Sequence, residues 1–143
     1  MIYKRIDSQN DPDIPYLDEI LNLPEISRFL SIDEHNYWTY VTNTENVFYF
    51  KVFENDVLVA ATHLEISNRT LYMDIMVIPT YQRKGVATTI LNDIQSGTLL
   101  LDFDKIEVSI DKSNTASIKL FEKMNFKFVS AENELLNYAW QKI

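Results

Sequence analysis

One apolar segment, residues 71–78, restricts the folds open to this chain more than any other feature. Its side chains are apolar on both alternating faces, as in a strand covered on both sides, and its single carboxylate is Asp74. After Pro79 the apolar spacing changes to that of a helix ended by Gly97, with one face formed by Val86, Ile90, Leu91 and Ile94. A buried strand therefore runs through a short loop into a helix.

The rest of the chain alternates between strand and helix patterns. Apolar and β-branched runs predict strands over 2–6, 47–53, 57–66, 105–111, 126–130 and 135–143. Helical spacing predicts helices over 14–21, 24–30 (with Ile26, Phe29 and Leu30) and 114–124, and a capping box, Ser31 to Glu34, before Tyr37, Trp38 and Val41. This order predicts one α/β domain over residues 1–143, in which an antiparallel meander leads into a strand–helix–strand crossover with helices on the sheet faces.

The composition argues against several classes of protein. The 143 residues include no cysteine, which excludes disulfides, thiolate metal sites and a cysteine nucleophile, and with two histidines we expect no metal centre. The net charge of −8 opposes binding to nucleic acid. No apolar run reaches the length of a membrane span and the first residues do not resemble a signal peptide, so we expect a cytoplasmic protein with no membrane partner.

The loop that joins the buried strand to its helix has the chemistry of an anion site. Backbone N–H groups at a helix start are unpaired and carry the positive end of the helix dipole. Gly85 and the small Ala87 leave room for a phosphate to approach the main chain, and Arg83 and Lys84 add positive charge. The same residues also fit a plain strand-to-helix turn with a solvated basic pair.

Two motifs resemble those of the GNAT superfamily of N-acetyltransferases. Gln82-Arg83-Lys84-Gly85-Val86-Ala87, after Val77-Ile78-Pro79, matches the family's pyrophosphate motif. The segment Asn114-Thr115-Ala116-Ser117-Ile118-Lys119-Leu120-Phe121-Glu122-Lys123-Met124-Asn125-Phe126 resembles its second signature helix, with Ala116 one place nearer to Asn114. The resemblance implies a mixed, mostly antiparallel central sheet with a splayed parallel strand pair and helices on both faces. It also implies transfer of an acetyl group from acetyl-CoA to a primary amine of a small molecule, peptide or protein.

The same resemblance implies a coenzyme site. The backbone of Met76 and Val77 would pair with the pantetheine arm, and the Val77 N–H would stabilise the developing oxyanion. Asn114 would contact the coenzyme arm, and it also suits a helix N-cap. The remaining contacts to acetyl-CoA are expected from Gln82, Arg83, Lys84, Gly85, Val86, Ala87, Thr88, Ser117 and Phe121.

An attacking amine must lose a proton, and Asp74 is the leading candidate for the base. A carboxylate on an apolar strand is costly unless it is paired or faces a cavity, and burial raises its pKa towards neutrality. The alternative is that Asp74 pairs with Arg69, Lys51 or backbone. Glu107, on a strand that alternates polar and apolar residues, is the second candidate.

Two positions depart from the family pattern. Asn125 replaces the glycine at the end of the second signature helix, which is tolerable because Asn enters the left-handed region more easily than other non-glycine residues. Phe121 stands where many members have a tyrosine that protonates the leaving thiolate. Because Phe121 cannot donate a proton, the alternative function is a non-catalytic module that binds acetyl-CoA and senses or regulates. The general acid stays open among water, Tyr81, Tyr72 and Ser117.

The acceptor side is expected in the acidic N-terminal half. Residues 1–70 carry 5 Lys/Arg against 12 Asp/Glu, and the aromatic cluster of this region consists of His35, Tyr37, Trp38 and Tyr40. Carboxylates and aromatic rings together favour a cationic amine acceptor. The alternative is that Tyr37 and Trp38 are core residues, and His63 is expected to be structural. Pairing of exposed sheet edges leaves a homodimer open.

Overall fold

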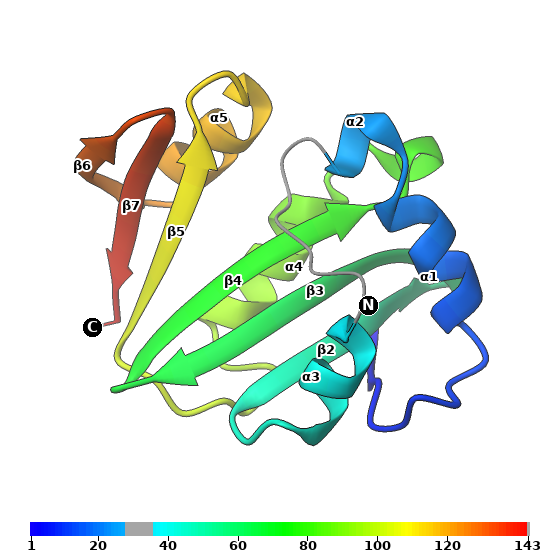
Figure 1. The fold of residues 1–143 in the computed structure, drawn as a ribbon. Helices are drawn as coiled ribbons and strands as arrows, with labels where there is room; N and C mark the ends of the chain where they lie inside the picture. The colour runs from blue at the N-terminus through cyan, green and yellow to red at the C-terminus, as the bar shows by residue number, and fades with distance from the viewer. Residues whose placement is uncertain (28–35, 143) are drawn as a thin grey trace.

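The computed structural model describes residues 1–27 and 36–142, which form a seven-stranded sheet in the order β1-β2-β3-β4-β5-β7-β6 with helices on both faces (Figure 1). The strands are β1 (Ile2–Arg5), β2 (Val47–Glu54), β3 (Val57–Ser67), β4 (Thr70–Val77), β5 (Lys105–Asp111), β6 (Lys127–Glu132) and β7 (Leu135–Gln141). The helices are α1 (Ile14–Leu21), α2 (Pro24–Ser27), α3 (Tyr37–Asn43), the short 3₁₀ turn η1 (Pro79–Tyr81), α4 (Val86–Gln95) and α5 (Thr115–Lys123). None of the helices in these ranges is long and apolar enough to span a membrane.

The order of the elements is the order that the sequence predicts, and most strand ends lie within two residues of the predicted ones. At the C-terminal end of the sheet, β6 continues to Glu132 and β7 ends at Gln141. The predicted contributions of Phe29 and Leu30, the capping box from Ser31 to Glu34, and His35 lie outside the described residues.

Two tight turns build the first half of the sheet. Asn55 and Asp56 connect β2 to β3, and Asn68 and Arg69 connect β3 to β4, and all four have positive φ, between 50° and 64°. Two consecutive left-handed residues are the mark of the hairpin turn whose twist matches that of antiparallel strands. Strands β1 to β4 are accordingly all antiparallel to their neighbours, as the predicted meander requires.

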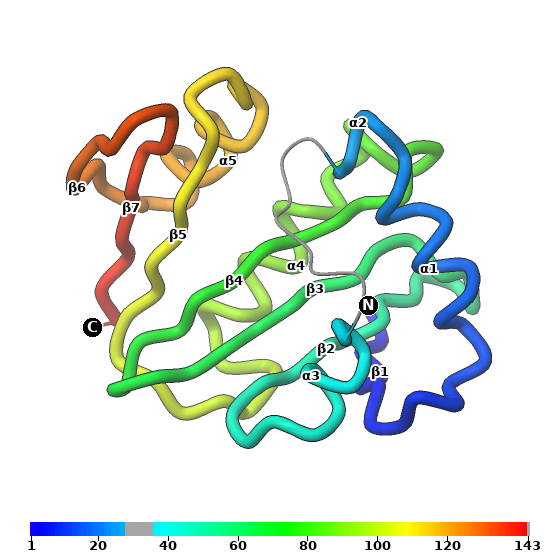
Figure 2. The backbone as a smooth tube through the Cα atoms, viewed as in Figure 1, coloured from blue at the N-terminus to red at the C-terminus, as the bar shows by residue number. Residues whose placement is uncertain are grey.

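The sheet contains one parallel pair, β4 with β5, and it is short. The two strands pair only from Thr70 to Tyr72 on β4, opposite Lys105 to Glu107 on β5. Beyond these residues β4 and β5 separate, as the ribbon and tube views show (Figures 1 and 2). Arg69 binds Asp102 and Asp104, at 2.9 and 2.8 Å, across the end where the strands still meet. The expected splayed parallel pair is therefore confirmed.

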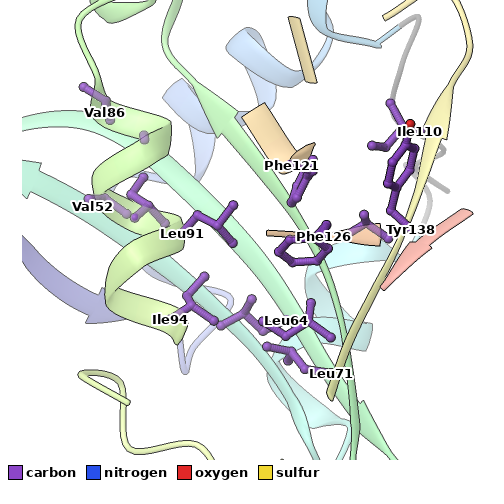
Figure 3. Packing of buried hydrophobic residues seen from close by; sticks show 14 of the residues in the cluster. Val52, Leu64, Leu71, Val86, Leu91, Ile94, Ile110, Phe121, Phe126 and Tyr138 are labelled. Carbon is purple, nitrogen blue, oxygen red and sulfur yellow. The ribbon is translucent and has the colours of Figure 1, made fainter. Parts of the chain in front are cut away.

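The two faces of the sheet carry separate cores. On β4, Met73, Ile75 and Val77 pack with α4 and α5, whereas Met76 packs with α1, α2 and α3. Figure 3 shows Leu91 and Ile94 of α4 directed at Leu64 of the sheet, and Phe121 and Phe126 between α4 and β5. Alternation of side chains along β4 thus sends odd-numbered residues to the α4 side and even-numbered residues, including Asp74, to the α1–α3 side.

Candidate active site

The splay between β4 and β5 opens into a hollow of about 480 Å³, here called the splay hollow. Its walls come from the end of β4, the loop before α4, the first turn of α4, the end of β5 and α5. The predicted coenzyme residues that line it are Met76, Val77, Gln82, Arg83, Gly85, Val86, Ala87, Thr88, Asn114, Ser117 and Phe121. Lys84 is outside this lining and is exposed on the loop. The fold therefore brings the two sequence motifs together around one cavity.

The loop before α4 presents a free helix start to the splay hollow. Arg83 and Gly85 have φ of 62° and 80°, and this pair of left-handed residues turns the chain into α4. The Thr89 N–H donates to the Gly85 carbonyl at 3.0 Å. The N–H groups of residues 86–88 come before it, in the first turn of the helix, where backbone N–H groups have no partner within the helix. A Cβ added at Gly85 would meet no other heavy atom within 4 Å, so the space in front of this backbone is open. These features fit a phosphate group.

The backbone of Val77 faces the gap between β4 and β5. The Ile78 N–H donates to the Val59 carbonyl on β3, at 2.9 Å. Because backbone groups alternate in direction along a strand, those of Val77 point the other way, towards the splay. The Gln82 side chain meets the Val77 carbonyl there, with Nε2 donating at 3.1 Å. The Val77 N–H is therefore directed to the place where an oxyanion stabiliser is expected.

Helix α5 forms the opposite wall of the splay hollow. The Asn114 side chain accepts a hydrogen bond from the Ser117 N–H at 3.3 Å, so the N-cap interpretation is confirmed. Phe121 is buried and packs edge-on against Phe126, with ring centroids 4.9 Å apart. Asn125 ends the helix with φ of 71°, the left-handed conformation expected there. Of the three side chains considered for the general acid, Tyr81 and Ser117 line the splay hollow with Phe121.

A second hollow, of about 640 Å³, opens beside β4 and is here called the acidic hollow. It is lined by Tyr37, His63, Glu65, Tyr72, Met73, Asp74, Glu107, Val108, Ser109, Val129, Ser130, Leu135, Asn137 and Tyr138. His63 pairs with Asp74 across β3 and β4, and Tyr72 pairs with Glu107 across β4 and β5, so these side chains share the α1–α3 face. The two hollows share Met73, Asp74, Val108 and Ser109.

Asp74 sits where the two hollows meet. Its side chain is exposed, but it lies inside the hollows that the surrounding protein forms. Desolvation by the surrounding protein raises the pKa of Asp74, and Glu65 raises it further, while a backbone hydrogen bond from His63 and, when its ring is protonated, the charge of His63 oppose the rise. A carboxylate with a raised pKa in a cavity has the properties of a general base.

The cations considered as partners of Asp74 bind elsewhere. Arg69 is held by Asp102 and Asp104. Lys51 is buried and binds Asp11 and Asp13, each at 2.9 Å. The alternative of an ion pair between Asp74 and either cation is therefore wrong, because carboxylates of the loops before α1 and β5 hold both cations. The same alternative named backbone as a partner of Asp74, and a backbone hydrogen bond from His63 to Asp74 is present.

The aromatic residues of α3 divide between the acidic hollow and the core. Tyr37 lines the acidic hollow and its hydroxyl meets His63 Nδ1 at 2.5 Å. Trp38 packs against Tyr49 at 4.9 Å and donates to Asp18 at 2.6 Å, as expected for a core contact. The Tyr40 hydroxyl donates to Glu65 at 2.6 Å.

Sequence reasoning missed the pair His63 and Glu65. Both lie on β3 two residues apart, and His63 Nε2 meets Glu65 Oε1 at 2.8 Å. The alternation Ala61, His63, Glu65 among apolar neighbours was the available signal, since it places both polar side chains on one face. Glu107 also lines the acidic hollow and binds Lys105 at 3.0 Å, so it does not simply face solvent.

The family model described as acetyltransferase (GNAT) family matches residues 14–126. This chain belongs to the GNAT acetyltransferase family. The match spans both motifs and the strands of the splay. The match therefore contains the whole lining of the splay hollow of this GNAT chain, whereas the part of the acidic hollow formed by Val129, Ser130, Leu135, Asn137 and Tyr138 lies beyond it. Comparison with curated protein sequences gave no match.

Solved structures share the fold of this GNAT chain. A domain from Methanocaldococcus jannaschii has a TM-score of 0.80 at 18% identity, with 98% of this chain and 97% of that chain covered. The N-acetyltransferase PseH from Campylobacter jejuni, in complex with acetyl coenzyme A, has a TM-score of 0.78 at 16% identity, covering 99% of this chain and 100% of that chain. The ribosomal-protein-S18-alanine N-acetyltransferase from Escherichia coli has a TM-score of 0.74 at 16% identity, covering 99% and 94%. At these identities the similarity establishes the fold.

Proposed function

We propose that this GNAT chain, working as a single domain, transfers the acetyl group of acetyl-CoA to a cationic primary amine of a small molecule, peptide or protein. The observation that carries the proposal is the meeting of the splay hollow and the acidic hollow at Asp74. A donor in the first and an acceptor in the second would react at that junction. The complex of PseH with acetyl coenzyme A, on the same fold, supports the donor.

The residues of the splay hollow have the chemistry that acetyl-CoA requires. The N–H groups of 86–88 and the Arg83 side chain would hold the pyrophosphate, and the backbone of Met76 and Val77 would pair with the pantetheine arm. The Val77 N–H would stabilise negative charge as it develops on the thioester oxygen. When bound, acetyl-CoA supplies the activated acetyl group and a thiolate leaving group.

The acidic hollow favours a cationic acceptor. Three carboxylates, Glu65, Asp74 and Glu107, line it, and its described lining contains neither Lys nor Arg. Such a surface attracts an ammonium group and repels an acidic acceptor. Tyr37, Tyr72 and Tyr138 add aromatic side chains to the same lining.

Asp74 is proposed as the base. An ammonium group that enters the acidic hollow gives one proton to the Asp74 carboxylate, directly or through a water molecule, and the neutral amine then attacks the thioester carbonyl. The raised pKa of Asp74 makes its carboxylate a better proton acceptor than an ordinary aspartate. As the intermediate collapses, the nitrogen loses its second proton, and the leaving thiolate gains one through water, Tyr81 or Ser117, because Phe121 has no hydroxyl. Glu107 is the second candidate for the base.

Two measurements test the proposed function. Calorimetry with coenzyme A should show binding, and thiol release from acetyl-CoA should rise with a cationic primary amine in an amine panel. Binding without thiol release by any amine would favour the non-catalytic alternative. Absence of coenzyme binding by the folded protein would contradict both. Whether two chains form a homodimer stays open, and sedimentation of the full chain would test it.

A further inference from the structure

A chain of hydrogen bonds runs along one wall of the acidic hollow. The Tyr37 hydroxyl meets His63 Nδ1 at 2.5 Å, and His63 Nε2 meets Glu65 Oε1 at 2.8 Å. The Tyr40 hydroxyl donates to the same Glu65 oxygen at 2.6 Å. Both ring nitrogens of His63 are therefore engaged, one on each side.

The donor and the acceptor of each bond follow from the Glu65 carboxylate, which can only accept. An ionised carboxylate has no proton to donate, so His63 must donate to Glu65 through Nε2–H. A neutral imidazole with its proton on Nε2 has a lone pair on Nδ1. The Tyr37 hydroxyl must then donate its proton to Nδ1. The oxygen of Tyr37 is left with lone pairs and no proton to offer the acidic hollow.

We propose that the Tyr37 oxygen is a hydrogen-bond acceptor for the acceptor ammonium group, with its polarity fixed by His63 and Glu65. The inference rests on the proposed function, because it assigns part of the acceptor site. Tyr37 would bind the substrate, whereas His63 and Glu65 are positioning residues that act through it. A site that accepts hydrogen bonds favours a ligand that offers an N–H group. It disfavours a ligand that presents only lone pairs there, such as those of a carboxylate or of a hydroxyl oxygen.

The geometry around Tyr37 supports this assignment. Tyr37 lines the acidic hollow together with Asp74, and His63 stands directly opposite Asp74 in the sheet. The Tyr37 ring is held edge-on by Trp38 and Tyr49, with ring centroids 5.1 and 6.0 Å away. The His63 side chain is 15% exposed and that of Glu65 is 34% exposed. The hydrogen bonds therefore run from the more buried His63 ring to the more exposed Glu65 carboxylate.

Protonation of His63 would reverse the arrangement. The imidazolium ring would donate from Nδ1 to the Tyr37 oxygen, and the Tyr37 hydroxyl would turn its own proton towards the hollow and against an ammonium group. The titratable groups around the His63 ring are Glu65 on its own strand, Tyr49 on β2, Asp74 and Tyr72 on β4, and Tyr37 and Tyr40 on α3. The affinity for the amine should therefore fall as His63 becomes protonated.

Steady-state kinetics of Tyr37→Phe test the inference. The variant keeps the ring and its packing and removes only the oxygen. We expect the KM of the best cationic amine to rise roughly tenfold or more, because a hydrogen bond to a charged group is lost, with kcat and the KM of acetyl-CoA nearly unchanged. Tyr16→Phe is the matched control, since Tyr16 on α1 is 44% exposed and lines neither hollow.

Nitrogen-15 NMR of the His63 ring supplies a readout that a merely structural role would not move. The chain has two histidines, so His35→Gln leaves a single imidazole signal. We expect the Nε2–H tautomer at neutral pH. In the wild type, the KM of the amine should rise as the His63 ring becomes protonated. In Tyr37→Phe this rise should be absent.

The possible outcomes separate the two proposals. An Nδ1–H tautomer or a protonated ring at neutral pH overturns the inference, and so does an unchanged amine KM in a folded Tyr37→Phe variant that acetylates the amine. A wild-type protein that binds coenzyme A but acetylates no amine overturns the proposed function, and the role of Tyr37 falls with it.

Discussion

Asp74 shows how one side chain can be costly for the fold and useful for chemistry. It is the one carboxylate on a strand that otherwise packs between two cores, and both hollows reach it. Its charge would be stabilised by a cation, but Lys51 and Arg69 are held by other carboxylates. The fold therefore leaves Asp74 with a raised pKa at the junction of the hollows.

Asp74→Asn should separate the base role from a structural one. The substitution keeps the size of the side chain and removes its basicity, so turnover should fall roughly 10²–10⁴-fold while the affinity for coenzyme A hardly changes. The measurement is a pH–rate profile of wild type and variant. Retention of the acidic limb in the variant would assign that limb to another group, with Glu107→Gln as the next variant to measure.

Thermal melts of the same variant test the raised pKa of Asp74. Because the pKa is higher in the folded protein than in the unfolded chain, the folded state holds the proton more tightly, and wild-type stability falls as pH rises from the ordinary aspartate pKa through the folded one. Asp74→Asn removes this loss. The variant should be at least as stable as wild type at neutral pH, and the difference should shrink at acidic pH. A lower melting temperature at neutral pH would indicate a stabilising partner for the carboxylate.

Gly85 is where backbone geometry and ligand space coincide. Its φ of 80° favours glycine, and a Cβ would meet no other heavy atom within 4 Å, so the protein itself leaves the space empty. Gly85→Glu should abolish binding of coenzyme A by calorimetry, because a carboxylate would occupy the proposed phosphate position. Gly85→Ala is the control for backbone strain alone. Tight coenzyme binding by folded Gly85→Glu would place the pyrophosphate elsewhere.

At the scale of elements, β2 anchors the loop that leads into α1. Lys51 is buried on β2 and holds both Asp11 and Asp13. Burial alone would lower the pKa of Lys51, but hydrogen bonds and charge from the two aspartates raise it overall. This ion pair network fixes the loop that precedes α1, and α1 packs on the α1–α3 face of the sheet.

Lys51→Met should destabilise the protein through this loop. Removal of the cation leaves two carboxylates without their shared partner, one of them largely buried, and the free energy of unfolding should fall by about 3 kcal/mol. Denaturant melts at neutral pH measure the change. Lys127→Met, at an exposed position of β6, is the matched control and should have little effect. Equal stability of the two variants would mean that the network contributes nothing net.

At the scale of the whole molecule, charge is distributed unevenly. Of the net charge of −8, residues 1–70 contribute −7, and these residues supply α1, α3 and, in the lining of the acidic hollow, Tyr37, His63 and Glu65. Long-range attraction of a cation would therefore add to the local carboxylates of the hollow. A field of this kind weakens with salt, because charges are screened over about 8–10 Å at physiological ionic strength.

Acceptor peptides with one reactive amine and different flanks test this charge effect. Catalytic efficiency should be highest for a lysine-flanked peptide, lower for a neutral one and lowest for a glutamate-flanked one, and the differences should narrow as ionic strength rises. The neutral peptide serves as the control for general salt effects. A preference for the glutamate-flanked peptide would contradict the proposed cationic acceptor.

The sequence by itself determined the strand at 71–78, its turn into α4 and the order of the elements, although Tyr72 and Asp74 on that strand are exposed in the structure. These features depend on neighbours within about a dozen residues: alternation, helical spacing, and a glycine where the chain must turn left-handed. The two motifs could be placed in one site only through resemblance to a family, because nothing local says that α5 faces the loop before α4.

Only the tertiary structure decided what surrounds Asp74. The register between β3 and β4 puts His63 opposite it, and α3 brings Tyr37 to His63 from 26 residues away in the sequence. The same long-range pairing gives Lys51 and Arg69 to other carboxylates, against the sequence-based alternative. A shift of one residue in strand register would move every side chain of that strand to the other face of the sheet. Contacts of this kind are therefore set by the packing of the whole sheet and not by any local pattern.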